Sequence, residues 1–377
     1  MIYGELGDSR TKRTVTGMAR LLRALRLDGM LLSALIAVSL FGLFVLYSAA
    51  GENTSLWLNQ LARIGIGFML LVVLAQVPDH FLRMLSPVVY LIGLILLVIV
   101  AFAGDVGKGA QRWLDLGVIR FQPSEIMKLA VPMMCAWYLH QRALPPSFRD
   151  VCIVMLIVLL PVGLVAEQPD LGTALLVAAS GMIVLVMGGI SPLYVAAGFA
   201  LIGAAVPVAW HFMHDYQRQR VLTLLDPQSD ALGAGYHIIQ SQIAIGSGGV
   251  FGKGWMNGSQ AQLEFLPERS TDFIYAVIGE ELGLLGLIAL LVGYLFIVTR
   301  GTYMAMQCRD AYARLLAGSI ALTFFVYACV NAGMVMGLLP VVGVPLPLVS
   351  YGGTSFVTLM AGFGILMSLH SSRKLLG

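Results

Sequence analysis

Long apolar segments recur along most of the chain and are separated by short polar stretches. A transmembrane helix needs about 20 mostly apolar residues to cross the hydrocarbon core of a bilayer. On that template the sequence predicts ten membrane-spanning helices, at residues 30–50, 57–77, 82–103, 123–141, 150–167, 172–190, 192–211, 272–299, 312–337 and 351–371. The pattern therefore predicts an all-α integral membrane protein with about ten transmembrane helices. A large external loop, at about 212–271, would join the seventh and eighth.

The overall composition supports this prediction. Of the 377 residues, 58% are hydrophobic and only 11% are charged, and the mean hydropathy is +0.86. Such a chain cannot keep its surface in water, so its solvent is lipid. We expect a basic cytoplasmic tail at 1–28 and a single polytopic membrane domain at 29–377. The first apolar run is as long as a membrane span, so we expect an uncleaved helix and no cleavable signal peptide.

Composition also excludes two classes of function. The formal net charge of +3 is small, and no basic run is interleaved with aromatic residues, so nucleic acid is not an expected partner. The four cysteines are single and widely spaced, without a CxxC pair, and are best interpreted as small hydrophobic residues.

Lysine and arginine are about twice as frequent on one side of the predicted helices as on the other. Because basic residues accumulate in cytoplasmic loops, this distribution predicts that both termini are cytoplasmic. The external basic residues concentrate in two loops, a short one expected at about 104–122 and the long one at about 212–271, which suggests that they have a function there. They are Lys108, Arg112, Arg120, Arg218, Arg220, Lys253 and Arg269.

An acid and a base occur together at the start of the fourth predicted span. A charged residue inside a span costs roughly 2.5–3.5 kcal/mol on insertion scales, so it should be paired, hydrated or functional. Glu125 and Lys128 are three residues apart, which places them on one face of a helix that we expect to begin at Pro123. Either a structural ion pair or part of a functional site explains them.

Two aspartates lie at predicted helix starts. Asp170, between Pro169 and Gly172, can cap the following helix. Asp272 opens the eighth predicted span, where Thr271 could be the N-cap and the helix dipole favours an acid. Asp272 also faces the largest external loop, and a carboxylate in partly apolar surroundings can accept a proton near neutral pH. Asp272 is therefore a candidate catalytic residue.

Residues 243–255, IAIGSGGVFGKGW, resemble a phosphate-binding loop only superficially. Lys253 is followed by Gly254 and not by Ser or Thr, and no strand is expected before it. We interpret the segment as a re-entrant loop packed on protein, and Glu280 as a structural partner within the eighth span. No group of His, Asp or Glu has metal-ligand spacing.

Six motifs together resemble the SEDS (shape, elongation, division and sporulation) family of bacterial cell-wall polymerases, over nearly the whole chain. The EFLPERSTDF wording and the short N-terminal tail are more similar to the elongation branch than to the division branch. The motifs are GAQRWLDLG from Gly109, RFQPSEIMKLA from Arg120, EQPDLGTA from Glu167, GYHIIQSQIAIGSGGVFGKGW from Gly235, EFLPERSTDFIYAVIGEELG from Glu264 and PLPLVSYGGTSF from Pro345.

This resemblance implies the SEDS fold and a peptidoglycan glycosyltransferase that polymerises lipid II. The growing glycan would move from its undecaprenyl pyrophosphate onto the 4-hydroxyl of an incoming lipid II sugar. Asp272 matches the essential acid of the family and would be the general base, while Glu125 and Lys128 match a charged pair in its central cavity. With Arg112, Arg120 and Lys253, Lys128 would neutralise the departing pyrophosphate. Asp170 and Ser350 are the remaining substrate-binding candidates.

The resemblance also implies a location and a partner. We expect the bacterial cytoplasmic (inner) membrane and a class B penicillin-binding protein of the elongation complex. The family allows a divalent cation, Mg²⁺ or Mn²⁺, which the sequence neither supports nor excludes. The alternatives are a lipid II flippase or transporter and a non-catalytic scaffold. No inverted repeat is apparent and the charges gather at the external face, which favours the enzyme.

Overall fold

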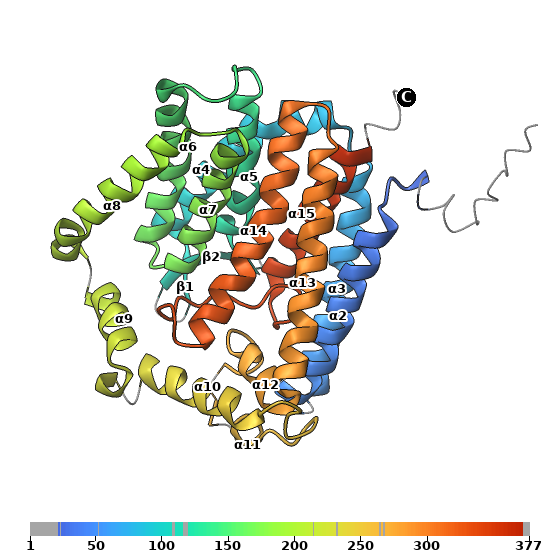
Figure 1. The fold of residues 1–377 in the computed structure, drawn as a ribbon, viewed down its shortest axis with the longest axis vertical. Helices are drawn as coiled ribbons and strands as arrows, with labels where there is room; N and C mark the ends of the chain where they lie inside the picture. Colours follow the sequence, from blue (N-terminus) through green and yellow to red (C-terminus); the bar gives the residue numbers. More distant parts are fainter. Residues whose placement is uncertain are drawn as a thin grey trace, which may run out of the picture.

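Long helices packed side by side form most of the molecule, and shorter helices gather at one end (Figure 1). This computed structural model describes residues 22–371 apart from 23, 52, 108–109, 116–119, 214, 231–232, 264 and 267. Most of the expected tail at 1–28 therefore lies outside the described residues.

The helices and strands follow in chain order. They are α2 (Gly29–Ala49), α3 (Thr54–Ala75), α4 (Asp79–Ala103), β1 (Asp105–Gly107), β2 (Ala110–Asp115), β3 (Arg120–Phe121), α5 (Pro123–Leu139), α6 (Phe148–Glu167), α7 (Leu171–Met187), α8 (Pro192–Phe212), α9 (Asp215–Leu225), η1 (Pro227–Asp230), α10 (Ala234–Gly248), α11 (Ser259–Gln262), α12 (Ile274–Glu281), α13 (Gly283–Met306), α14 (Ala311–Val335) and α15 (Gly353–Ser371).

The predicted fold class is confirmed. All ten segments expected to span the membrane are helical, and among the described residues seven helices are long and apolar enough to cross it: α2, α3, α4, α6, α13, α14 and α15. Helices α5 and α7 have 17 residues each. They pack in the interior of the bundle, where α5 contacts α4, α7 and α14.

Short polar side chains cap several of these helices and fix where they begin. Asp28 accepts from the Leu31 N–H at 2.9 Å, Asn53 caps α3, and Ser147 forms a capping box with Asp150 on α6. Each cap satisfies an amide that the first turn of a helix leaves without a partner. As expected, α5 begins at Pro123, whose missing N–H is harmless at that position.

The expectation of one helix at 272–299 is wrong. The segment divides into α12 and α13, and Gly283 at the break has φ +64, a conformation that favours glycine. The chain near Gly252 packs against the break, and the Leu284 N–H donates to the Gly249 carbonyl at 3.0 Å. The expected N-cap at Thr271 is also wrong, because α12 begins at Ile274 with Phe273 as its N-cap residue.

Two predicted loops contain secondary structure. Residues 104–122 include a three-stranded antiparallel sheet in the order β1-β2-β3, and the segment 212–271 contains α9, η1, α10 and α11. The first half of the expected re-entrant loop belongs to α10. The rest lies on α12, where the N–H groups of Lys253 and Gly254 donate to the carbonyls of Glu280 and Glu281 at 2.9 and 3.0 Å.

Glycines allow α3 and α15 to approach each other closely. A Cβ at Gly364 of α15 would lie 3.0 Å from the Leu71 Cα, and one at Gly67 of α3 would lie 2.7 Å from the Phe356 ring. This close contact fixes the position of α15 along α3. It thereby positions the N-terminus of α15, which forms one wall of the cavity described below. Gly65, also on α3, has open space around it.

We predict opposite effects for alanine at two of these glycines. Gly364→Ala should lower the free energy of unfolding by about 1–3 kcal/mol, because the two backbones must separate. Gly65→Ala should raise it by about 0.5–1 kcal/mol, because glycine is unfavourable inside a helix. Thermal unfolding in detergent compares the variants, and equal stability of both would contradict the close contact.

Candidate active site

A cavity of about 200 Å³ lies between the first turns of α5, α7 and α15. Helix α14 contributes Tyr327, the β1–β3 sheet contributes Trp113, and the segments 343–345 and 352–355 complete the wall. Three charged side chains, Glu125, Lys128 and Asp170, line it. A concave site with a few converging polar groups among apolar side chains is typical of small-molecule binding.

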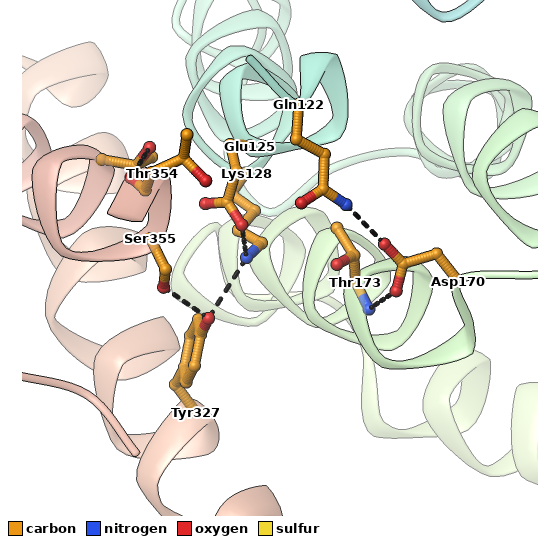
Figure 2. Close-up of polar contacts among 9 residues, drawn as sticks. Gln122, Glu125, Lys128, Asp170, Thr173, Tyr327, Thr354 and Ser355 are labelled. Carbon is orange, nitrogen blue, oxygen red and sulfur yellow. Dashed lines mark hydrogen bonds and ion pairs between the residues drawn. The ribbon is translucent and has the colours of Figure 1, made fainter. Parts of the chain in front are cut away.

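The predicted pair Glu125 and Lys128 is formed. Lys128 Nζ donates to Glu125 Oε1 at 2.7 Å, and both residues are buried, at 8% and 4% exposure. The lysine also donates to the Tyr327 hydroxyl at 3.3 Å, and that hydroxyl lies 2.7 Å from the Ser355 hydroxyl (Figure 2). Helices α5, α14 and α15 thus each contribute to one buried polar network.

A second polar pair joins the starts of α5 and α7. Gln122 Nε2 donates to Asp170 Oδ2 at 2.7 Å, while Asp170 Oδ1 accepts from the Thr173 N–H at 3.2 Å (Figure 2). The predicted capping role of Asp170 is therefore confirmed. The Asp170 side chain therefore both caps α7 and lines the cavity.

Asp272 lies next to this cavity, behind Gly343. A Cβ at Gly343, which lines the cavity and has φ +71, would lie 3.5 Å from Asp272 Oδ2. Asn331 Nδ2 donates to the carbonyls of Asp272 and Val344 at 2.8 and 2.7 Å, which ties the aspartate to the cavity wall. Gly343 is thus a cavity residue that lies beside the Asp272 carboxylate.

Ser350 supports the backbone beside Asp272. Its hydroxyl donates to the Thr271 carbonyl and accepts from the Leu346 N–H at 2.7 Å, while the Tyr351 N–H donates to the Ser270 carbonyl at 2.8 Å. The segment leading to α15 therefore holds the turn that carries Asp272. The contacts of the Ser350 hydroxyl are with backbone groups of the chain.

His237 on α10 also belongs to the surroundings of Asp272. Its ring stacks on Phe273, with centroids 5.4 Å apart. Burial lowers the pKa of the His237 imidazole, and the carboxylates Glu268 and Asp230 act in the opposite direction. The ring is accordingly neutral near neutral pH.

The remaining basic candidates are not brought together at the cavity. Lys253 donates to Glu280 Oε1 at 2.7 Å and does not line the cavity. Arg112 lies on β2 and Arg120 on β3, close to the cavity in the chain, but their side chains lie outside the described part of the structure.

The described residues do not provide a protein-held metal centre. No three His, Cys, Asp or Glu side chains within this part of the chain come close enough together to hold an ion.

A family model described as "Cell cycle protein", covering the FtsW, RodA and SpoVE proteins, matches residues 26–375. The chain belongs to this family. The resemblance of its six motifs is thereby confirmed, and the motif residues Glu125, Lys128, Asp170, Asp272 and Ser350 all lie at or beside the cavity.

Relatives in the FtsW/RodA/SpoVE family cover nearly the whole chain. The peptidoglycan glycosyltransferase MrdB of Escherichia coli K12 is 52% identical over 93% of this chain and 95% of its own. A chain of a peptidoglycan synthase complex, whose structure concerns the coordination of polymerization and crosslinking, has 33% identity and a TM-score of 0.81, covering 92% and 98% of the two chains. The rod shape determining protein RodA of Thermus thermophilus has 28% identity and a TM-score of 0.69, covering 92% and 97%.

Sequence reasoning missed several residues of the site. Tyr327 and Ser355 are neutral residues in apolar helices, so no charge drew attention to them. Trp113 and Gln122 lie inside two of the quoted motifs, but only the charged neighbours were singled out. His237 likewise lies inside a motif and has no acid or base near it in sequence.

We predict that replacing both members of the Glu125–Lys128 pair destabilises the protein less than replacing the lysine alone. Lys128→Met should destabilise the protein by about 3–5 kcal/mol, because it leaves a buried carboxylate without its cation. The double variant Glu125→Gln with Lys128→Met should lose less. Thermal unfolding of both single variants and the double variant measures the coupling, and simple additivity of their effects would contradict a direct pair.

Proposed function

We propose that this chain is a peptidoglycan glycosyltransferase that polymerises lipid II during cell elongation, with Asp272 as the general base. Membership of the FtsW/RodA/SpoVE family and 52% identity to a protein named peptidoglycan glycosyltransferase support the activity. The observation that carries the assignment of Asp272 is its carboxylate beside Gly343, at the wall of a cavity that contains a buried lysine.

In this mechanism Asp272 accepts the proton of the acceptor 4-hydroxyl as that oxygen attacks the anomeric carbon of the growing glycan. A new carbon–oxygen bond forms there while the bond from the anomeric carbon to the lipid pyrophosphate breaks. The bonding electrons leave with the pyrophosphate, and the proton stays on Asp272. Positioned general bases of this kind contribute typically 10²–10⁴-fold in rate.

Lys128 and the first turn of α15 suit the departing pyrophosphate. The lysine is fixed by Glu125 and Tyr327, and its third N–H is not taken by these two partners. Gly353, Thr354 and Ser355 bring the positive end of a helix to the same cavity. Donors fixed before the reaction stabilise developing charge without reorganisation. Arg112 and Arg120 would add positive charge from the external sheet.

Two of the predicted substrate residues suit a different role. We assign Lys253 to the neutralisation of buried Glu280, and Ser350 to positioning the turn that carries Asp272. Asp170 would act through Gln122, whose amide it orients. These assignments leave Lys128 as the principal cation at the cavity.

The proposed setting is the bacterial cytoplasmic (inner) membrane, with both termini cytoplasmic. In support, Asp28 at the start of α2 pairs with Arg300 at 2.6 Å, and His370 near the end of α15 lies 3.3 Å from the Met304 carbonyl, so both ends of the described chain lie on one side. The proposed partner is a class B penicillin-binding protein. A Mg²⁺ or Mn²⁺ ion, if the reaction uses one, would enter with the pyrophosphate.

We predict that Asp272→Ala abolishes polymerisation, with a loss of at least about 100-fold, because the acceptor hydroxyl then has no base. The assay supplies labelled lipid II to the purified protein with its penicillin-binding partner and measures glycan polymer. Glu268→Gln, an exposed acid on the same turn, is the matched control and should stay active.

Normal polymerisation by folded Asp272→Ala would remove the catalytic assignment. If the unaltered complex made no polymer but moved lipid II across proteoliposomes, the transporter would replace the enzyme.

A further inference from the structure

Trp113 is an aromatic side chain at the external end of the cavity that the mechanism above does not use. It lies on β2 and lines the cavity together with Gln122. Strands β2 and β3 pair Leu114 with Phe121, and Trp113 and Gln122 are the chain neighbours of these two residues. The fold therefore places an indole beside an amide at this end.

Gln122 has unused hydrogen-bonding capacity toward the cavity. Its Nε2 donates to Asp170 Oδ2 at 2.7 Å, and this bond orients the amide. An amide offers two N–H donors and a carbonyl acceptor. Among the contacts of the described residues, this one bond is the only hydrogen bond of the Gln122 side chain, so Oε1 and the second N–H remain for a ligand.

The two ends of the cavity differ in charge. Figure 2 shows Gln122 and Asp170 on one side of Lys128, with Thr354 and Ser355 on the other. The first turn of α15 contains no acidic residue, so its positive end adds to the lysine. Gln122 is the N-cap residue of α5 and Lys128 lies six residues further along the chain, which is about 9 Å along a helix axis. The cavity thus suits a molecule with an anion at one end and a neutral, polar ring at the other.

We infer that Trp113 and Gln122 form a subsite for the pyranose ring attached to the lipid pyrophosphate, with Asp170 as a positioning residue. This inference rests on the proposed function and adds the recognition of the sugar to it. A pyranose presents apolar C–H groups on its faces, which pack on an indole, and hydroxyl or N-acetyl groups at its edge, which bond to an amide. The pyrophosphate of the same molecule lies toward Lys128 and α15.

The test compares the binding of two lipids to purified protein, lipid II and undecaprenyl pyrophosphate, which carries no sugar. The ratio of their dissociation constants measures the contribution of the disaccharide-peptide headgroup, and the change of this ratio in a variant measures the contact that the variant removes. Trp113→Ala should reduce the preference for lipid II about tenfold, the effect of one lost aromatic contact. Trp113→Phe should retain most of it, and Gln122→Leu should also reduce it.

Trp255→Ala is the matched control, because this tryptophan stacks on Phe44 with ring centroids 4.8 Å apart and does not line the cavity. It should leave the ratio unchanged. An unchanged ratio in Trp113→Ala would overturn the inference, whether the affinity for both lipids stays the same or falls equally. The ratio is measured without polymerisation, so it stays informative in Asp272→Ala. Polymerisation by that variant would refute the proposed catalytic base and leave the sugar subsite to be judged by binding alone.

Discussion

A charge inside a membrane-embedded bundle must have a partner, and this constraint organises the site. Glu125 and Lys128 satisfy it within one turn of α5, where their spacing makes the pair almost independent of the rest of the fold. Tyr327 and Ser355 then bring α14 and α15 to the same lysine. A local ion pair allows the helix to enter the bundle, and non-local hydrogen bonds convert the pair into one side of a cavity.

Asp272 depends on a different kind of support, because it lies on a turn and not within a helix. Asn331 of α14 holds its carbonyl, and the segment before α15 holds the carbonyls of Ser270 and Thr271. The α12–α13 break belongs to the same arrangement, since a continuous helix at 272–299 could not turn around the loop near Gly252. Contacts from separate elements thus fix a carboxylate that no local secondary structure would hold.

The sequence predicted those features that depend on local composition. Apolar length located all ten helical segments, and charge located Glu125, Lys128 and Asp272. The break at Gly283 was not predicted because both halves of the segment are apolar and the loop that packs against it comes from more than 30 residues earlier. The sheet at 104–122 was missed because its strands are short. Tyr327 and Gln122 became recognisable only when folding brought them to Lys128 and Asp170.

Two glutamate–lysine pairs illustrate what the structure adds to the sequence. Each has an Nζ–Oε1 distance of 2.7 Å, and sequence reasoning proposed both lysines as pyrophosphate ligands. Glu280 also accepts from the Ser259 hydroxyl and from the N–H groups of Gln260 and Ala261, so its carboxylate is fully used within the protein. Glu125 Oε2, in contrast, is buried without a hydrogen-bond partner. Buried polar groups are normally satisfied, so an unsatisfied one at a cavity indicates a place where a substrate completes the network. The carboxylate of Glu280 is thus engaged within the fold, whereas the carboxylate of Glu125 fits the role proposed above for its pair.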